Sequence, residues 1–211
     1  MIPPVSAVAD VLKLWGLDGW LSPPLRPVVA ASGPTIGRAM TITIVSAATG
    51  PGLAPVYSML SRDLSGRFVV IGGGAQVNGA VWGEIMSTAA CANDCTGVLV
   101  DGFVRDRPTM ASIGLPVYAT AECVVGPNGT AHVVEVGAPV RIGDVVIEPL
   151  DSIVADDTGC VRIPQSQLAD ILEAATRYAA AEDRVVRALV AGEPLTGAYL
   201  HKKTIVDELR R

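Results

Sequence analysis

Residues 97–106 read Gly97-Val-Leu-Val-Asp-Gly-Phe-Val-Arg-Asp106, and this stretch decides how the middle of the chain folds. Its first four residues predict a short buried strand over 97–100, and Asp101-Gly102 predicts a turn after it. In α/β proteins, ligands bind at the loops that follow such strands. The adjacent pair Arg105 and Asp106 is therefore the first candidate site.

A second segment belongs to the same candidate site. Residues 80–93 predict a helix that contains a glycine-led start, Gly83-Glu-Ile-Met86. Free backbone N–H groups at a helix start suit a carboxylate. Arg105 adds a planar charged fork for that anion or for a developing oxyanion, and Asp106 is able to hold a hard divalent cation. Together these groups predict a site that binds and polarises a small 2-oxo acid.

Composition limits the class of protein. The chain has 211 residues, a size that favours one domain, here residues 1–211. Half of the residues are hydrophobic but only 4% are aromatic, which indicates a core of aliphatic side chains. A net charge of −5 argues against a nucleic-acid partner. No membrane span and no signal peptide are predicted, so we expect a cytoplasmic protein without a membrane partner.

The pattern of segments predicts a layered α/β domain. Strands and helices alternate in the first half, and short strands separated by turns follow from residue 131, as in a β-meander. Apolar residues at helical spacing predict a long helix over 165–190, and residues 204–211 suggest one more helical piece. The C-terminal helices, 165–211, are expected to belong to the same domain.

Other catalytic arrangements have weaker support. Gly72-Gly-Gly74 follows a strand, but Val77 stands where a dinucleotide fingerprint needs its last glycine. A tight loop or backbone crowding explains these glycines better, and a methyltransferase is the third hypothesis that they allow. Neither His132 nor His201 lies in a nucleophile motif. General base work therefore falls to a carboxylate or a metal-bound water.

Two central segments, Gly83-Glu-Ile-Met-Ser-Thr-Ala-Ala90 and Gly97–Asp106, resemble the RraA-like family. This family contains class II pyruvate aldolases, which act on 4-hydroxy-4-methyl-2-oxoglutarate and related 4-carboxy-4-hydroxy-2-oxo acids. It also contains the regulator of ribonuclease E activity A. The resemblance covers residues 5–190 and implies a layered α/β/β domain. Further agreements are Gly37-Arg-Ala-Met-Thr41, Phe68-Val-Val-Ile-Gly-Gly-Gly74, Pro139-Val-Arg-Ile-Gly143 and Val154-Ala-Asp-Asp-Thr-Gly159.

The resemblance implies a role for each candidate residue. The backbone amides of Gly83, Glu84, Ile85 and Met86 would hold the substrate carboxylate. Arg105 would contact the 2-oxo oxygen, Asp106 would ligate Mg²⁺ or Mn²⁺, and Glu84 would lie near the metal's waters. A further acidic residue would come from a neighbouring subunit, with Glu182 or Asp183 as candidates. The family also implies a homotrimer or a dimer of trimers, and the mean hydropathy of +0.43 independently favours subunit contacts.

The chain departs from the family pattern at two places. The aldolase motif continues Arg-Asp-x-x-Glu/Asp, whereas Thr109 stands at its last position. This change removes a carboxylate that would help to order the metal's water shell. A family Pro-Gly-Asp is here Pro149-Leu150-Asp151, which we expect to change only a turn.

The resemblance implies a metal-dependent retro-aldol lyase that also decarboxylates oxaloacetate. A metal-linked water or hydroxide would take the proton from the C4 hydroxyl, and C3–C4 cleavage would leave a pyruvate enolate held by the metal and Arg105. The competing hypothesis is a non-catalytic binding protein like the ribonuclease E regulator, which the departure at Thr109 favours.

Overall fold

A twisted sheet carries the candidate site. The structure is a computed structural model that describes residues 1–21, 24–127 and 129–210. Nine of the strands among these residues form one sheet, and β8 and β9 form a separate hairpin. The strands are β1 (Arg26–Val29), β2 (Thr35–Ser46), β3 (Arg67–Gly72), β4 (Ala80–Trp82), β5 (Gly97–Val104), β6 (Val117–Glu122), β7 (Ala131–Val136), β8 (Val140–Ile142), β9 (Val145–Ile147), β10 (Ser152–Asp156) and β11 (Gly159–Ile163).

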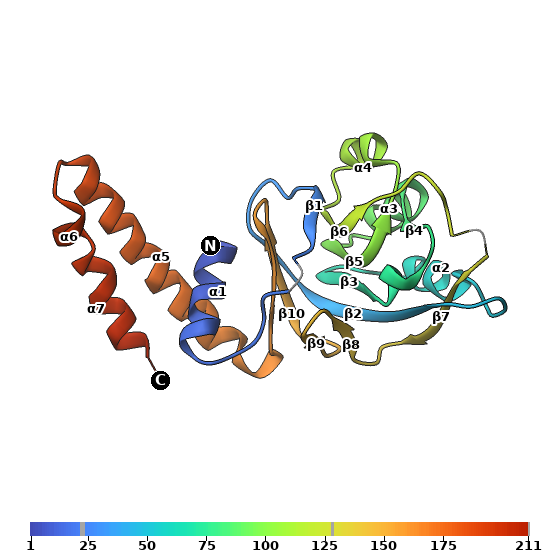
Figure 1. Cartoon of the computed structure of the whole chain (residues 1–211), viewed down its shortest axis with the longest axis horizontal. Coiled ribbons are helices and arrows are strands. Elements are labelled where there is room, and N and C mark those ends of the chain that lie inside the picture. Colours follow the sequence, from blue (N-terminus) through green and yellow to red (C-terminus); the bar gives the residue numbers. More distant parts are fainter. Residues whose placement is uncertain (22–23, 128, 211) are drawn as a thin grey trace.

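Helices cover the sheet and extend beyond it (Figure 1). The helices are α1 (Val5–Leu14), α2 (Ala54–Leu60), α3 (Glu84–Ala92), α4 (Arg107–Ile113), α5 (Leu168–Val190), α6 (Leu195–Ala198) and α7 (Leu200–Leu209), with 3₁₀ turns at Gly74–Gln76 and Gln165–Gln167. No helix in the described parts of the chain has both the length and the apolar character needed to cross a bilayer. The mixed α/β fold that the sequence predicts is confirmed.

Parallel pairing organises the centre of the sheet. The order is β1-β6-β5-β3-β2-β10-β11, and the neighbours from β2 to β6 run parallel. β4 adds parallel to β5, and β7 adds antiparallel to β2. The twelve-residue strand β2 serves several partners because its first half pairs with β10 and its second half with β7. These pairings bring the C-terminal ends of β4 and β5 together, which is where the candidate site lies.

Alternation along the strands divides the core between the two faces of the sheet. In β3, Val69 and Ile71 pack with α2, α3 and α4, whereas Phe68 and Val70 pack with the β8–β9 hairpin. A third apolar cluster joins α1 and α5 to β10 and β11. The helices α2 to α4 therefore rest on one face of the sheet, and two of them contribute to the candidate site.

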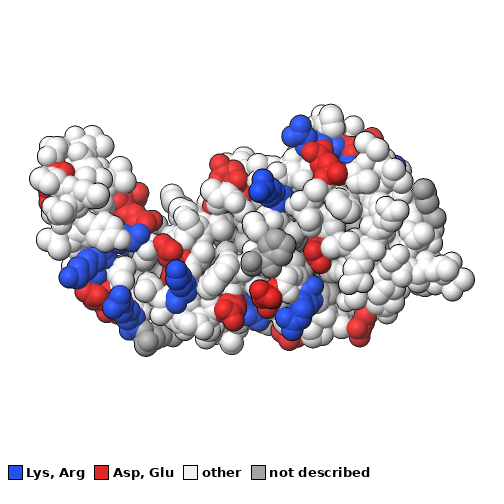
Figure 2. Space-filling view, in the orientation of Figure 1, with Lys and Arg blue, Asp and Glu red and all other residues white. Residues whose placement is uncertain are grey.

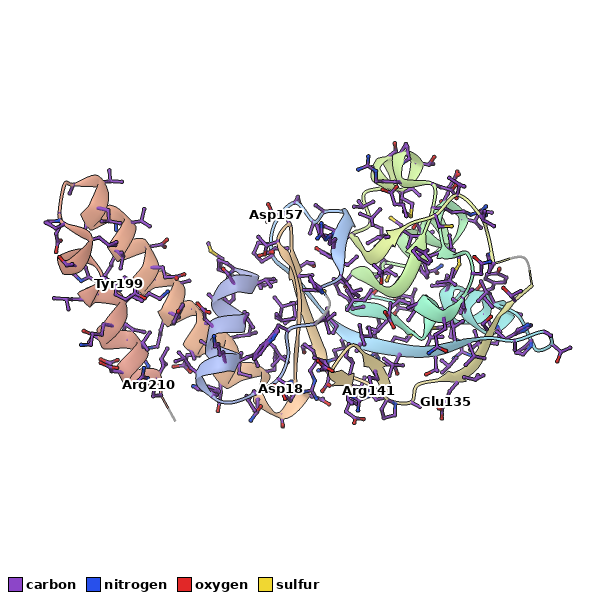
Figure 3. The ribbon with its side chains drawn as sticks, in the orientation of Figure 1. Asp18, Glu135, Arg141, Asp157, Tyr199 and Arg210 are labelled. Atoms are coloured by element: carbon purple, nitrogen blue, oxygen red, sulfur yellow. The ribbon has the colours of Figure 1, made fainter. Side chains whose placement is uncertain are left out.

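The C-terminal helices form an arm that projects from the sheet. The middle of α5 is held by α1, since the Tyr178 hydroxyl donates to Asp10 at 2.7 Å. Along the arm, Arg177 pairs with Glu208 of α7 at 2.5 Å. Tyr199 lies on the arm, far from Glu135 on the sheet (Figure 3).

The surface carries charges of both signs. On the face shown in Figure 2, Lys and Arg side chains are interspersed with Asp and Glu along the sheet and the arm. Apolar side chains exposed on and around the α5–α6 end of the arm include Val190, at 85% exposure, and Leu195, at 60%.

Three local predictions were wrong. Residues 80–93 are not one helix: Ala80–Trp82 form β4, which pairs with β5, and α3 begins only at Glu84. The reason is burial, since Val81 and Trp82 are both 1% exposed and fit a buried strand better than an exposed helix turn.

Asp101-Gly102 is not a turn but lies within β5, which continues to Val104 past an irregular register. Gly102 has φ +158°, and a Cβ there would lie 2.6 Å from the Gly74 backbone, so close packing requires this glycine. The predicted β-meander is also wrong, because β2 takes both β7 and β10 as direct neighbours. Among the described residues, only β8–β9 and β10–β11 are hairpins of the predicted kind.

Candidate functional site

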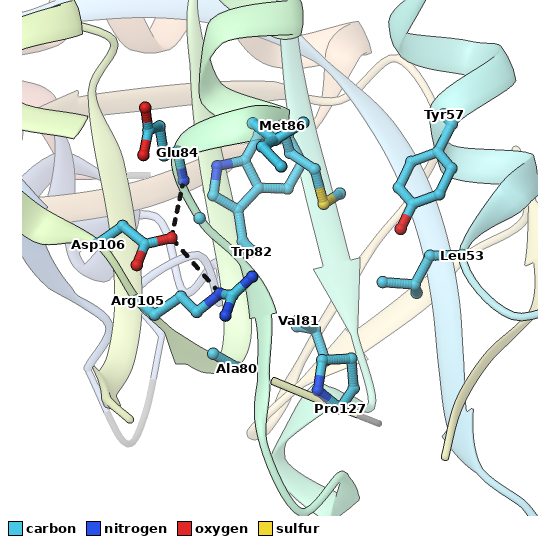
Figure 4. Close-up of a pocket in the computed structure, with 12 residues that line it drawn as sticks. Leu53, Tyr57, Ala80, Val81, Trp82, Glu84, Met86, Arg105, Asp106 and Pro127 are labelled. Carbon is cyan, nitrogen blue, oxygen red and sulfur yellow. Dashed lines mark hydrogen bonds and ion pairs between the residues drawn. The ribbon is translucent and has the colours of Figure 1, made fainter. Parts of the chain in front are cut away.

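One hollow of about 140 Å³ gathers the predicted residues of the central motif. It lies where the C-terminal ends of β4 and β5 meet the start of α3, and α2 and the segment after β6 close its other side (Figure 4). The predicted residues that line it are Gly83, Glu84, Ile85, Met86, Arg105 and Asp106. Residues 22 positions apart in the sequence are therefore neighbours, as the motif predicts.

Backbone pairing creates this proximity. The Arg105 N–H donates to the Trp82 carbonyl at 3.0 Å, which places Arg105 beside Gly83. The Trp82 indole N–H donates to the buried Ser87 hydroxyl at 2.7 Å, and this bond links β4 to α3. A Cβ at Gly83 would lie 2.8 Å from Asp106 Oδ2, so any other residue here would displace the Asp106 side chain.

Asp106 directs its carboxylate toward the start of α3. Its Oδ2 accepts the Glu84 N–H at 3.4 Å and lies 3.4 Å from Arg105 Nε (Figure 4). The Arg105 and Asp106 side chains are 45% and 38% exposed, so their pairing adds little to stability and leaves both groups accessible to a ligand.

The backbone of Asp106 is unusual for a residue that precedes a helix. It occupies the N-cap of α4 with φ +63°, in the left-handed region, and its side chain makes no capping bond to α4. An N-cap aspartate normally bonds to its own helix. Left-handed backbone at a non-glycine residue costs free energy and clusters at functional sites. Asp106 is thus held in a conformation that presents its carboxylate to the hollow instead of to its own helix.

The donor set suits one type of metal ion. Asp106 and Glu84 offer carboxylate oxygens, and no cluster of three or more His, Cys, Asp or Glu side chains with metal-binding arrangement occurs among the described residues. A hydrated Mg²⁺ ion fits this set because it keeps several waters and takes one or two carboxylates. A zinc site with three or four protein ligands does not fit. Thr109 is exposed in the first turn of α4 and brings no carboxylate.

Glu182 and Asp183 lie elsewhere in the same chain. Both belong to α5 of the arm, where Glu182 accepts a bond from Lys202 Nζ at 2.6 Å. Asp183 lines a separate hollow beside Pro3 and Pro4. The chain does not bring them to the hollow at Asp106, and their contribution from a neighbouring subunit stays a prediction.

The opposite wall of the hollow was not predicted. It consists of Leu53 and Tyr57 at α2 and Pro127 after β6. The spacing of residues within the central motif does not predict this wall, because long-range pairing of β2, β6 and β7 brings its residues to the site. His132 of β7 does not join the hollow, but its Nδ1 accepts the Gly52 N–H at 2.8 Å and so fixes the chain just before Leu53.

The Gly72–Gly74 run is explained by backbone crowding, the simpler of the alternatives. A Cβ at Gly73 would lie 2.2 Å from the Ile44 carbonyl oxygen, and one at Gly74 would lie 2.7 Å from that of Asp101. The glycines thus pack against β2 and β5 and offer no support for a methyltransferase. Burial raises the pKa of the neighbouring Asp101 carboxyl, although a bond from the Gly73 N–H opposes this effect.

Comparisons with known proteins confirm the family that the sequence resembles. A family profile described as RraA-like, Aldolase/RraA, matches residues 5–162. Protein DlpA of Legionella pneumophila is 26% identical over 92% of this chain, although the chain spans only 31% of that relative's length. A putative 4-hydroxy-4-methyl-2-oxoglutarate aldolase of Halalkalibacterium halodurans is 26% identical over 94% of this chain and 90% of the relative.

A solved structure shows the same fold. The crystal structure of an uncharacterized protein from Pseudomonas syringae pv. tomato superposes with a TM-score of 0.81 at 26% identity. The match covers 93% of this chain and 92% of that chain. The likeness therefore extends over nearly the whole length of both chains.

Proposed function

This chain belongs to the RraA-like family of aldolases and RraA proteins, and we propose that it is a divalent-metal-dependent lyase that releases pyruvate from 4-hydroxy-2-oxo acids. The class includes 4-hydroxy-4-methyl-2-oxoglutarate, and oxaloacetate decarboxylation would be a side activity. The observation that carries the proposal is the Asp106 carboxylate, which turns away from its own helix toward Arg105 and the start of α3.

Each group of the site has a task in this reaction. The N–H groups at the start of α3, from Glu84 to Met86, bind the substrate carboxylate, and Arg105 donates to the 2-oxo oxygen. Asp106, with Glu84 close by, would hold Mg²⁺ or Mn²⁺. When bound, the cation supplies Lewis-acid polarisation of the 2-oxo group.

Cleavage then follows from proton and electron movements on the substrate. The C4 hydroxyl loses its proton. The Glu84 carboxylate lies at the hollow and is able to accept this proton through a water molecule. The C3–C4 bond breaks, C4 becomes a carbonyl carbon, and the electron pair forms the enolate of pyruvate. Arg105 stabilises the enolate oxygen, a contribution typically worth about 3–4 kcal/mol. Protonation of C3 completes the release of pyruvate.

The direct test is pyruvate release from 4-hydroxy-4-methyl-2-oxoglutarate and from oxaloacetate. We expect turnover that EDTA abolishes and that added Mg²⁺ or Mn²⁺ restores. Turnover that persists in EDTA would refute the metal-dependent mechanism. Titration of the protein with Mn²⁺ gives a readout independent of activity, and binding to the wild-type chain is expected to exceed binding to Asp106→Asn.

A binding protein that regulates ribonuclease E is the second candidate. Thr109 favours it, because the aldolase motif has a carboxylate at this position and the exposed threonine cannot replace it. Thr109→Glu distinguishes the two candidates. If the site is an aldolase with a weakened metal shell, this variant gains Mn²⁺ affinity and turnover. A pull-down that captures ribonuclease E with an inactive wild-type chain would support the regulator.

We further propose that the chain assembles as a homotrimer or a dimer of trimers, with Glu182 or Asp183 reaching the neighbour's site. Mixing subunits tests this arrangement. Asp106→Asn and a double variant, Glu182→Gln with Asp183→Asn, should each be inactive alone. Their mixture should regain part of the activity, because some sites then contain both intact halves. A mixture that stays inactive would contradict the shared site.

A further inference from the structure

The two sides of the candidate hollow differ in chemical character. Arg105, Asp106 and Glu84 lie on one side, whereas Leu53 and Tyr57 lie across from them (Figure 4). Between the two sides, the hollow is lined by buried apolar side chains, among them Val81, Trp82 and Met86. A ligand anchored on Arg105 therefore extends toward an apolar wall.

Charge is scarce on the apolar side. Among the described residues that line the hollow, Arg105 is the only cation, and it already faces the Asp106 carboxylate at 3.4 Å. The next arginine, Arg107, lines an adjoining hollow and pairs with Glu122 at 3.5 Å. A second carboxylate on the ligand would lose water at the apolar wall without gaining a cation from the described residues of this chain.

The apolar wall is fixed by the sheet. The Gly52 N–H donates to His132 Nδ1 at 2.8 Å, and the Val133 N–H donates to the Gly52 carbonyl at 3.0 Å. These two bonds to β7 hold the chain immediately before Leu53. The Ala80 N–H donates to the Val125 carbonyl at 2.8 Å and ties down the segment that leads to Pro127, the third residue of this wall. The wall is therefore preorganised for contact with a ligand.

We propose that the substrate carries an apolar, uncharged group beyond C4 instead of the second carboxylate found in the substrates of the related aldolases. This inference rests on the proposed function and narrows its substrate class. The C3–C4 bond breaks, its electron pair goes to the pyruvate enolate, and C3 then takes up a proton. The C4 hydroxyl loses its proton, so the second product is an apolar aldehyde or ketone.

Binding of unreactive 2-oxo acids tests the inference without requiring turnover. The matched pair is 5-methyl-2-oxohexanoate and 2-oxoglutarate, in which an isopropyl group replaces a carboxylate of similar shape. In calorimetric titrations with Mg²⁺ present, we expect the branched acid to bind at least tenfold more tightly. Equal or tighter binding of 2-oxoglutarate overturns the inference, and so does failure of both acids to bind.

Turnover separates this inference from the proposed function. The substrates are 4-hydroxy-2-oxopentanoate, 4-hydroxy-2-oxohexanoate and 4-hydroxy-2-oxoglutarate. We expect kcat/KM to rise about fourfold with the added methylene and to be lowest for the dicarboxylate. Preference for the dicarboxylate contradicts the inference but leaves the lyase intact. If none of the three substrates yields pyruvate, the proposed function is refuted. The binding titrations then still test whether the wall prefers an apolar group.

Variants locate the effect in the wall. Leu53→Arg adds the missing cation and is expected to reverse the preference toward 2-oxoglutarate. Val190→Arg adds the same charge at an 85% exposed position of the arm and serves as the matched control. Thermal melting confirms that both variants are folded.

Tyr57→Phe tests the one polar group of the wall. Removal of the hydroxyl should leave binding of the branched acid unchanged. The contrary outcome has two parts: the wild-type protein binds 2-oxoglutarate more tightly than the branched acid, and Tyr57→Phe weakens the binding of 2-oxoglutarate alone. In that case the Tyr57 hydroxyl recognises a carboxylate, and the assignment of an apolar wall is wrong.

Discussion

Two turns of the molecule share a backbone conformation that side chains normally avoid. Asp106 has φ +63° at the end of β5, and Leu150 has φ +72° between β9 and β10. At both positions a non-glycine residue occupies the left-handed region, which costs about 1–2 kcal/mol. Asp106 faces the candidate site, whereas Leu150 is 38% exposed and does not line the hollow.

The surroundings of the two turns differ in what they hold in place. At Leu150, the backbone is bonded to Ala39 of β2, and Asp151 accepts bonds from the Glu148 N–H and from Arg162 Nε. This network fixes the turn regardless of the side chain at position 150. At Asp106, the conformation aims the carboxylate itself. The same backbone conformation is thus held by a surrounding network at Leu150, whereas at Asp106 it orients a carboxylate toward Arg105 and the start of α3.

The largest effect is expected from Asp106→Asn. Asparagine tolerates the left-handed region, so the backbone and the melting temperature should change little. Loss of the charge should lower pyruvate release about 10³-fold, as removal of a key electrostatic group does. Parallel assays of turnover, Mn²⁺ binding and thermal melting measure these outcomes. Near-normal turnover of Asp106→Asn would show that the orientation of the Asp106 carboxylate does not matter for the reaction.

Asp151→Ala should have the next largest effect, on stability. The variant leaves the Arg162 guanidinium, whose side chain is only 17% exposed, without its carboxylate partner. We expect a loss of about 3 kcal/mol in the free energy of unfolding, measured by urea denaturation. An unchanged midpoint would show that the network does not hold the Leu150 turn.

Gly83→Ala should have an intermediate effect on turnover. The new Cβ would lie 2.8 Å from Asp106 Oδ2 and 3.0 Å from Arg105 Cγ, so these side chains must move. A tenfold fall in kcat/KM, or about 1.4 kcal/mol, is expected with a nearly normal melting temperature. A large loss of stability with full activity per folded molecule would contradict this expectation.

The smallest effect is expected at the Leu150 turn. Leu150→Gly should raise the free energy of unfolding by about 0.5–1 kcal/mol, because glycine relieves the strain but has greater freedom when unfolded. Turnover should not change. Asp106→Gly should also gain stability but should lose turnover. If Leu150→Gly and Asp106→Gly change stability and turnover in the same way, the proposed difference between the two turns is wrong.

The sequence predicted the charged side of the site because its parts are local. Gly83 to Met86 and Arg105–Asp106 each lie within one motif, and their type alone indicates an anion and cation site. The apolar wall was not predictable in this way. Leu53 and Tyr57 reach the hollow only because β7 pairs with β2 and fixes the chain before α2, a contact between residues about 80 positions apart.

Burial also decided the local errors. Residues 80–82 fit a helical pattern, but the Trp82 ring is buried and parallel pairing with β5 is available to them. Gly102 suggested a turn, although it is needed so that the Gly74 backbone can pack against β5. In each case a distant segment overrode the local preference.

The long strand β2 has a consequence for how the molecule forms. Its residues pair with β3, with β7 and with β10, so Arg38 meets Ser152 across 114 positions of the chain. Such distant pairings must all be found before the sheet is complete, and folds of this kind assemble in roughly milliseconds to seconds. During this interval the backbone N–H and C=O groups along the edges of β2 lack their strand partners. The chain must therefore be synthesised up to β10 before β2 is fully paired, and unpaired strand edges favour aggregation until then.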